Sequence, residues 1–348
     1  MQPVEFLVWG KKALYACMRM VYTGGLLGLW SMPVHAAGLT LPARGVAGMM
    51  RGGASIAGND SLQSMWYNPA NLAASQRVRM LIDTTLLLSP SRFTRAPNVQ
   101  NGSVRVRFDE VQSLTAMPDP SLLFAWGWPT LGLTMGAGLY APYARTSSYP
   151  EQGAQRYSVV GNQGSLIVIA QLSLAWAMGE RFRIGGSLQN AFARFSLRKA
   201  ISGYTGLFGT AEDPDLDAMA QVDAMSWLGV SANFGLWGRL FVFPGGGLDL
   251  AASVQLPFVM NAAGALQVYL PTHPLYRSAR FEGEGVEVTL QLPWILRTAA
   301  RLNLGEGRVD FEAAFVLEMW SSQEQLLIRP LGRGIFVRNI PVLRRIRV

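Results

Sequence analysis

The chain has 348 residues, of which 50% are hydrophobic and only 15% are charged, and its formal net charge is +8. The charge lies at the two ends: residues 1–36 hold three basic residues and one acid, residues 329–348 hold six arginines and no acid, and the stretch between them is neutral. A nucleic-acid partner, which needs a basic face spread through the fold, is therefore not expected.

The N-terminus has the three parts of a signal peptide. Basic residues up to Arg19 precede an apolar stretch at 21–34, and the sequence Val-His-Ala ends at Ala36. We predict a leader over residues 1–36 that is cleaved after Ala36. Cleavage removes Cys17, the only cysteine, so the mature chain has no disulfide or thiolate metal site. A signal anchor is the alternative interpretation, and the shortness of the apolar stretch disfavours it.

Residues 37–76 are rich in glycine, alanine and small polar residues. Such a segment approaches its neighbours closely but has too few large apolar groups to form its own core. We therefore predict a plug, or hatch, that folds inside another structure. Its candidate functional residues are Gly52, Gly53, Asn59, Asp60, Asn68, Pro69 and Ala70. No Lys-Ser/Thr pair follows the glycines, so a phosphate-binding loop is not expected.

From residue 78 onward, apolar and polar residues alternate repeatedly, which indicates strands with one apolar face. About twelve strands are predicted: 78–88, 103–108, 121–128, 131–140, 164–178, 181–193, 222–236, 248–256, 262–270, 286–292, 296–304 and 309–319. After the leader, no apolar run reaches the length of about 18 residues that a transmembrane helix needs.

The fold class predicted is therefore all-β and antiparallel, and two arrangements could bury one face of the strands. A soluble sandwich turns the apolar face inward, whereas a transmembrane barrel turns it to lipid and lines its lumen with the polar face. Strand lengths of about ten residues and aromatic residues near strand ends favour a barrel over 77–328. In this arrangement the even-numbered, mostly apolar residues of segment 222–236 lie on one face along its whole length, and Glu287, Thr289 and Gln291 line the lumen.

Six charged residues are candidates for the lumen wall: Asp223, Asp249, Arg297, Arg301, Asp310 and Glu312. They could steer a carboxylate head group, or they could form a balanced ladder that stiffens the barrel. The ladder is favoured because barrel interiors are polar by default.

The sequence Trp-Tyr-Asn-Pro-Ala-Asn-Leu-Ala at 66–73, with the Gly/Ala run at 47–58 before it, resembles the N-terminal hatch of the FadL/TodX family. The sequences at 138–143 and 318–322 agree in type and order, so the resemblance covers about residues 37–328.

The resemblance implies a β-barrel in the outer membrane of a Gram-negative bacterium. Its implied function is passive uptake of hydrophobic molecules such as long-chain fatty acids or aromatic hydrocarbons, gated by the hatch and with no cofactor. In the family a lateral opening of the wall is the favoured exit. The implied partners are the hydrophobic ligand, outer-membrane lipid and lipopolysaccharide, and the barrel assembly machinery.

Two departures from the family pattern stand out. Asn71 occupies a position where the family commonly has glycine. The basic segment 329–348 ends without an aromatic residue, and about two to four strands are lacking from a barrel of fourteen. The chain is interpreted as a truncated product or as a reduced barrel, and truncation is favoured because an open sheet edge in lipid leaves backbone groups unpaired.

Other functions remain as alternatives. An outer-membrane hydrolase is disfavoured because loss of the leader leaves one histidine, His273, in a proline-bracketed loop with no Gly-x-Ser-x-Gly sequence elsewhere. A metal site is not expected for the same reason. A barrel that serves as a surface or secretion scaffold without transport is not distinguished from a transporter by the sequence.

Overall fold

The alternating residues form long strands in the computed structural model, which describes residues 43–58, 61–100, 103–106, 108–143, 146–204, 213–277, 279–305, 308–322, 326–331, 334–337 and 340–343. All described elements lie in one unit, Leu39–Val348. Within these ranges thirteen strands form a single antiparallel sheet, so the predicted all-β class is confirmed. No helix in the described ranges is long and apolar enough to cross a membrane.

The main sheet contains β1 (Arg79–Phe93), β4 (Val111–Trp128), β5 (Leu133–Tyr143), β6 (Leu166–Met178), β7 (Phe182–Ser202), β8 (Asp217–Ser226), β9 (Val230–Phe243), β10 (Gly246–Gln255), β11 (Phe258–Tyr269), β13 (Gly285–Leu292), β14 (Ile295–Leu304), β15 (Val309–Glu318) and β16 (Leu327–Pro330). Two small sheets pair β2 (Asn98–Gln100) with β3 (Ser103–Val106), and join β12 (Ala279–Glu282), β17 (Gly334–Val337) and β18 (Ile340–Leu343). Short 3-10 helices are η2 (Pro214–Leu216), η3 (Pro274–Tyr276) and η4 (Trp320–Ser322).

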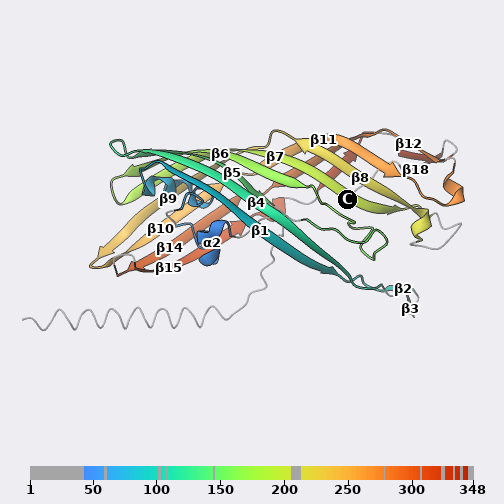
Figure 1. Cartoon of the computed structure of the whole chain (residues 1–348), viewed down its shortest axis with the longest axis horizontal. Helices are drawn as coiled ribbons and strands as arrows, with labels where there is room; N and C mark the ends of the chain where they lie inside the picture. The colour runs from blue at the N-terminus through green and yellow to red at the C-terminus, as the bar shows by residue number, and fades with distance from the viewer. Residues whose placement is uncertain are drawn as a thin grey trace, which may run out of the picture. The chain divides into compact units, whose positions relative to one another are not determined.

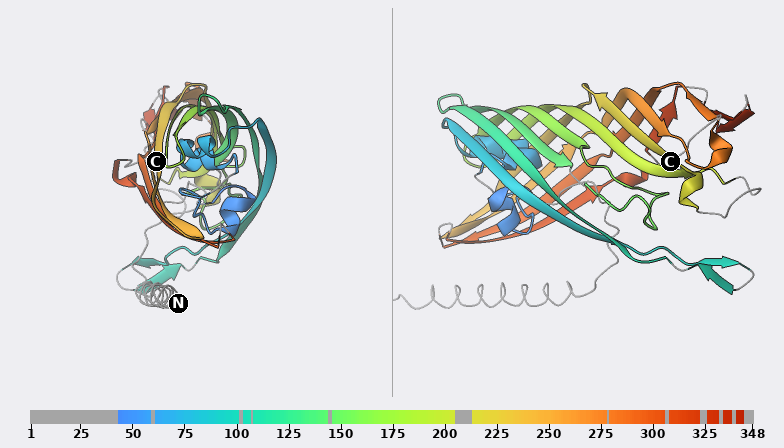
Figure 2. Two further views of the ribbon diagram at one scale, coloured as in Figure 1. Left: turned by 90° about the vertical axis from the view of Figure 1, so that its left-hand side faces the viewer. Right: turned by 45° about the vertical axis from the view of Figure 1, so that its right-hand side comes forward.

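The hatch, residues 43–76 where described, lies inside the curved sheet. Its elements are α2 (Gly45–Met50), α3 (Ser64–Tyr67) and η1 (Pro69–Ala74). Figure 2 shows these blue helices surrounded by the strands, and η1 packs against β6, β7 and β9. The hatch therefore shares one buried cluster with the wall instead of forming a core of its own.

Three times in succession the chain crosses the sheet as two strands separated by a short break, and the three breaks lie at the same level. β8 and β9 both pair with β7, and the chain is interrupted between them at 227–229. β10 and β11 are separated at 256–257, and β13 and β14 at 293–294. Because β11 pairs with β8 and β13, while β10 pairs with β9 and β14, the breaks lie side by side. We call this line of breaks the seam.

The seam divides the wall into two halves. The hatch half consists of β9, β10 and β14, which Figure 1 shows near α2, and the far half consists of β8, β11, β13 and β16. At the first break Asn190 of β7 pairs with Val230, and Ala193 of β7 pairs with Ser226. The two β7 residues are three positions apart in the sequence, whereas their partners are four positions apart, so the segment between β8 and β9 contains one extra residue. One extra residue in a strand is a β-bulge, and it turns every later side chain to the opposite face.

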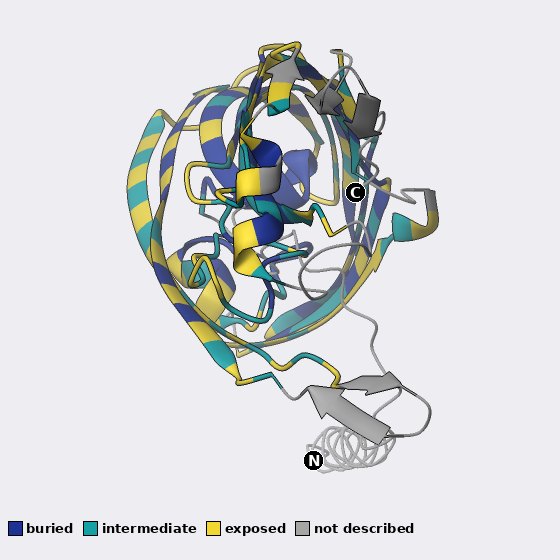
Figure 3. Ribbon diagram, turned by 90° about the vertical axis from the view of Figure 1, so that its right-hand side faces the viewer, coloured by how far each residue is buried: buried dark blue, intermediate teal, exposed yellow. Residues whose placement is uncertain are grey.

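Burial shows this reversal. In β9 the odd-numbered Ser231 and Asn233 are buried, whereas in β8 the even-numbered Val222 and Ala224 are buried. Figure 3 shows the alternation as dark and yellow bands along the strands. The lumen is consequently polar in the hatch half and apolar in the far half. The buried apolar residues of the far half include Val222, Ala224, Phe258, Met260, Ala262, Leu266, Val286, Val288, Leu290, Leu292 and Ile328.

Two details of the expected strands are therefore wrong. Segment 222–236 is not one strand of constant phase but β8 and β9 with opposite phases. Glu287, Thr289 and Gln291 do not line the lumen, because Val286, Val288, Leu290 and Leu292 on the same strand are the buried residues. In addition, the predicted strand at 103–108 forms β3 in a small separate sheet.

Candidate functional site

The Asn-Pro-Ala sequence holds the hatch by a compact turn. The Asn68 side-chain oxygen accepts from the Ala70 amide at 3.0 Å and caps η1, whose first residue is Pro69. The Asn68 amide group donates to the Leu236 carbonyl of β9 at 3.0 Å, so the cap is also a bond to the wall. Asn71, which departs from the family pattern, is buried and donates to the Ile56 carbonyl at 3.0 Å within the hatch.

Glycines in the wall make room for this turn. A side chain at Gly185 of β7 would meet the backbone of Pro69 and Ala70, and one at Gly235 of β9 would meet the side chain of Asn68. Glycine at these two positions leaves space in the wall for the turn, and a larger residue would fill that space. We call this part of the wall the dock.

Polar side chains of β6, β9 and β10 hold the backbone of α3. Gln171 donates to the Met65 carbonyl at 3.0 Å, Asn233 to the Trp66 carbonyl at 3.1 Å, and Ser253 to the Tyr67 carbonyl at 2.6 Å. Each donor is buried, and each bond is made to backbone, which satisfies the last carbonyls of a short helix. The polar lumen of the hatch half is thus used largely to bind the hatch.

The other end of the hatch is held by charges on β15. Arg51 donates to Asp310 at 3.0 Å and to Glu312 at 3.0 Å. Glu312 also accepts from the amides of Ile56 and Ala57, each at 2.9 Å. Just before this contact the chain reverses at Gly52 and Gly53, whose φ angles are 62° and 89°.

The structure brings several of the predicted lumen charges together. Arg301 donates to Asp310 at 2.8 Å, so Asp310 joins β14 to the Arg51 contact. Asp249 is fully buried and accepts from Arg239 at 2.7 Å and from Asn303 at 2.7 Å.

The remaining predicted residues lie elsewhere. Asp223 is half-buried on the face opposite Val222 and Ala224, and accepts from Gln221 at 2.8 Å. It is therefore not one of the inward side chains of β8. The predicted hatch residues Asn59 and Asp60 and the cleavage site Ala36 lie outside the described residues.

Arg297 belongs to a buried cluster around Trp66 of the hatch. Its guanidinium carbon lies 5.8 Å from the centre of the Trp66 ring, and that of Arg44 lies 5.9 Å from it. Arg44 pairs with Asp119 at 3.0 Å, whereas Arg297 donates to the Gln255 amide oxygen at 3.1 Å. Sequence reasoning missed Arg44 and Gln255, because residues so far apart in the chain share no local pattern.

Several polar atoms of this cluster are buried without a hydrogen-bond partner. They are one terminal nitrogen each of Arg44 and Arg297, the amide nitrogen of Gln255, and the hydroxyls of Tyr140 and Tyr143. A buried donor without a hydrogen-bond partner is energetically costly. Gln255 and Arg297 end the polar half, and Phe258 and Leu292 begin the apolar half on the same passes.

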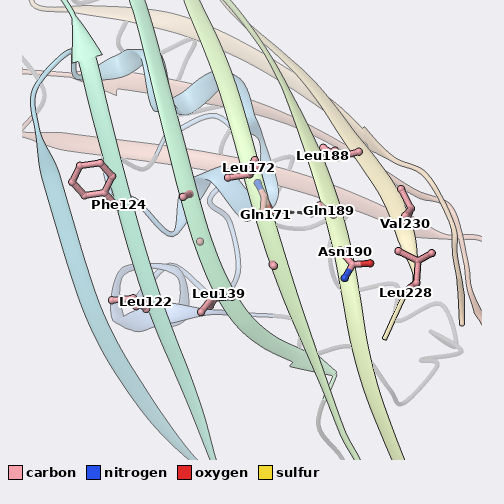
Figure 4. A pocket seen from close by; sticks show the side chains of 13 residues that line it. Leu122, Phe124, Leu139, Gln171, Leu172, Leu188, Gln189, Asn190, Leu228 and Val230 are labelled. Carbon is pink, nitrogen blue, oxygen red and sulfur yellow. Dashed lines mark hydrogen bonds between the residues drawn. The ribbon is translucent and has the colours of Figure 1, made fainter. Parts of the chain in front are cut away.

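The outer face of the wall has an apolar groove of about 440 Å³. Figure 4 shows Leu122, Phe124, Leu172 and Leu188 projecting from strands that have the hatch behind them. Asn190 lies at one end of the groove, where it bonds the backbone of the first break at Trp227 and Gly229. A side-chain amide thus replaces backbone pairs that the bulge removes.

A depression in the outer face of the wall lies between β4 and β6, and we call it the window. β4 pairs with β1 along its whole length but pairs with β5 only over Leu122–Trp128. The β5–β6 register shifts after Tyr140, and the next three residues, 141–143, are all buried. The depression has a volume of about 560 Å³ and lies between β4, the end of β5 and the loop at 146–165.

Residues 28–339 match the family described as "Outer membrane protein transport protein (OMPP1/FadL/TodX)". The chain belongs to this family. The FadL/TodX proteins are outer-membrane transporters of hydrophobic compounds, not enzymes. This membership agrees with the main feature of the described residues, a hatch held inside a wall of strands. No group of three or more His, Cys, Asp or Glu residues suited to a metal occurs within the described ranges.

Solved structures of FadL/TodX proteins agree with the fold. A Pseudomonas aeruginosa FadL homologue matches with a TM-score of 0.69 and 15% identity, covering 86% of this chain and 74% of that one. The Pseudomonas putida toluene transporter TodX matches with a TM-score of 0.61 and 15% identity, over 86% and 76%. The Ralstonia pickettii toluene transporter TbuX gives 0.60 and 15%, over 84% and 76%. No curated protein matches the sequence.

Proposed function

We propose that this FadL/TodX protein carries hydrophobic molecules passively across the outer membrane, with the ligand bound in the lumen and the hatch as the gate. The observation that carries this proposal is the change of the lumen at the seam, from polar around the hatch to apolar in the far half. A barrel that only needed stiffness would gain nothing from an apolar interior above a docked hatch, whereas a hydrophobic ligand needs one.

The cluster at the seam favours an amphiphile with an acidic head group. Arg297 is 3% exposed, has one terminal nitrogen without a partner, and lies near the Gln255 amide and the Tyr143 hydroxyl. A carboxylate would satisfy these donors, and its tail would extend into the far half. Toluene transporters such as TodX and TbuX show that the fold also serves neutral ligands. The proposal for this chain is therefore a long-chain carboxylate in preference to a neutral hydrocarbon.

The proposed route avoids passage through the hatch dock. A ligand at the seam lies at the level of Tyr140 and Tyr143, where β5 bends and the window begins. From the window the apolar outer groove leads along the wall past Leu139 and Leu172. Release sideways into the membrane keeps a hydrophobic ligand out of water throughout.

The proposed organisation assigns a leader to residues 1–36, the hatch to 37–76, the barrel to 77–328 and a basic segment to 329–348. The outward apolar residues of β9, from Val230 to Leu240, span about ten residues, enough for a tilted strand to cross the hydrocarbon layer. Trp227 and Trp294 lie exposed at the seam, and Trp126 and Trp176 at the other ends of their strands. We therefore place the hatch half in the bilayer, in contact with membrane lipid, and the far half in the lipopolysaccharide layer.

Uptake into cells tests the proposal. A strain without its own FadL/TodX proteins, with and without this chain, would be given a labelled long-chain fatty acid and labelled toluene in parallel. We expect the chain to increase uptake of the fatty acid more than that of toluene. Equal stimulation of both would remove the carboxylate preference but keep transport. Unchanged uptake of both in cells with folded protein in the outer membrane would favour the scaffold.

A further inference from the structure

The loop at 146–165 is a compact body that lies across the window. Its two ends are tied together, since the Ser147 amide donates to the Asn162 side-chain oxygen and the Asn162 amide donates to the Ser147 carbonyl at 3.1 Å. The Tyr149 amide donates to the Val160 carbonyl at 2.8 Å. A loop closed on itself in this way moves as one piece.

On one side the loop is firmly attached to β7 and β8. Val160 donates to the Arg198 carbonyl at 2.7 Å, and Arg198 donates back to Gly161 at 2.8 Å. The Arg156 guanidinium donates to Asp217 at 2.7 Å, and Arg156 and Asp217 are both about nine-tenths buried. The Tyr157 hydroxyl donates to the same carboxylate at 2.8 Å. Backbone pairs and charge-assisted bonds are the strong contacts of a loop.

On the other side the loop meets β4, β1 and the segment after β1 through neutral hydroxyls and one cation–π contact, in which the Arg95 guanidinium carbon lies 5.7 Å from the centre of the Tyr157 ring. The Ser148 amide donates to the Ser113 hydroxyl at 2.8 Å, and the Thr115 hydroxyl donates to the Thr146 carbonyl at 2.8 Å. The hydroxyls of Ser91 and Tyr149 lie 2.8 Å apart. Neutral side-chain bonds exchange readily with water and contribute less than the charged contacts on the β7 side.

We infer that loop 146–165 is a lid over the window, hinged on β7 and β8 and released from β4, so that it regulates the lateral passage of ligand. The inference rests on the proposed function. The depression at the window is lined on one side by Leu114, Ala116 and Pro118 of β4, and on the other by Gln163, Gly164 and Ser165 of the loop. Separation of the loop from β4 therefore widens this same depression into a passage.

A reversible cross-link tests the lid. The chain's only cysteine is Cys17, so two introduced cysteines would form a defined pair. Ser113→Cys with Ser148→Cys would join β4 to the loop, whose contact at this point is already within hydrogen-bond distance. Ala300→Cys with Ala313→Cys is the matched control, because it joins two strands that are paired in the sheet. A Ser91→Ala, Tyr149→Phe double variant removes one release-side bond without a cross-link.

We expect oxidation of the Ser113/Ser148 variant to reduce fatty-acid uptake to the level of cells without the chain, and reduction to restore it. The control pair should transport equally in both states, and the Ser91/Tyr149 variant should transport at least as fast as the wild type. Full uptake by the oxidised variant, with the disulfide demonstrated on a gel, would overturn the lid. Absence of uptake by the reduced variant and by the wild type alike would instead refute the proposed transport function.

Discussion

The two halves of the lumen are built from the same alternating strands, yet they have opposite interiors. In the hatch half, Ser231, Asn233 and Ser253 point inward, and the last two of these bind the hatch backbone. In the far half, Val286 and Val288 point inward and leave an apolar interior. One extra residue at a break is sufficient to change the lining, because side chains on a strand repeat every two residues. A single bulge in each strand can therefore place an apolar pocket next to the polar part of the wall that binds the hatch.

The strongest test of this comparison is a pair of charges on β13. Val288→Asp would place an unpaired carboxylate in the apolar interior, and we expect it to destabilise the barrel by about 4 kcal/mol or more. Thr289→Asp, one residue away on the outward face, loses only the exposed hydrogen bond to Asn261 and should cost no more than about 1 kcal/mol. Urea unfolding in liposomes measures both. A tolerated Val288→Asp with an unfolded Thr289→Asp would mean that β13 has the opposite phase.

The hatch half can be tested with a single methyl group. Gly235→Ala would push against Asn68, and we expect about 1–3 kcal/mol of destabilisation and a leaky lumen. Gly186→Ala is the control, because its added carbon lies in ordinary contact with Phe234 on the outside, at 3.4 Å. Influx of a hydrophilic dye that the wild type excludes would measure the leak. Equal exclusion by both variants would show that the dock does not seal the barrel.

The boundary between the halves is tested at Arg297. Arg297→Met removes the cation with the unpartnered nitrogen, and we expect affinity for a long-chain carboxylate to fall about tenfold while that for toluene is unchanged. Arg297→Met also removes the bond to the buried Gln255 oxygen, so stability should fall by about 1–3 kcal/mol, and binding is compared on protein shown to be folded. Binding to purified protein in detergent, measured by calorimetry, separates the two ligands. An equal loss for both would assign Arg297 to structure alone.

The smallest expected effect concerns the loop beside the far half. Burial and the hydrogen bond to Asp217 raise the pKa of Tyr157 to about 12. The stability that this bond contributes is therefore fully present below the ordinary tyrosine pKa of about 10, and it is lost as the pH rises through about 12. We expect the loop to become sensitive to protease between pH 10 and 12. Tyr157→Phe should be somewhat more sensitive at neutral pH and should not change across this interval. A wild-type loop with constant sensitivity up to pH 12 would contradict the assignment.

The sequence predicts the strands and the hatch well because both have local patterns, namely alternation and the Trp-Tyr-Asn-Pro-Ala sequence. It does not predict the seam, because Val222, Ala224, Phe234 and Leu236 are all even-numbered and apolar, and only the extra residue between them reverses the phase. The contacts of Arg44 with Asp119 and of Arg51 with Glu312 are also missed. They join residues far apart in the chain, whose proximity depends on how the sheet curves around the hatch.

The most direct test of the central claim is to locate a bound ligand along the lumen. A fatty acid with a photoreactive diazirine at the tail end and another with the diazirine near the carboxylate would be cross-linked to the purified wild-type barrel, and the labelled peptides would be identified by mass spectrometry. The account predicts that the tail probe labels Val286–Leu292 and Phe258–Leu266, and that the head probe labels the surroundings of Trp66 and Arg297. Labelling of both probes confined to outward residues such as Leu172 and Phe234 would contradict it.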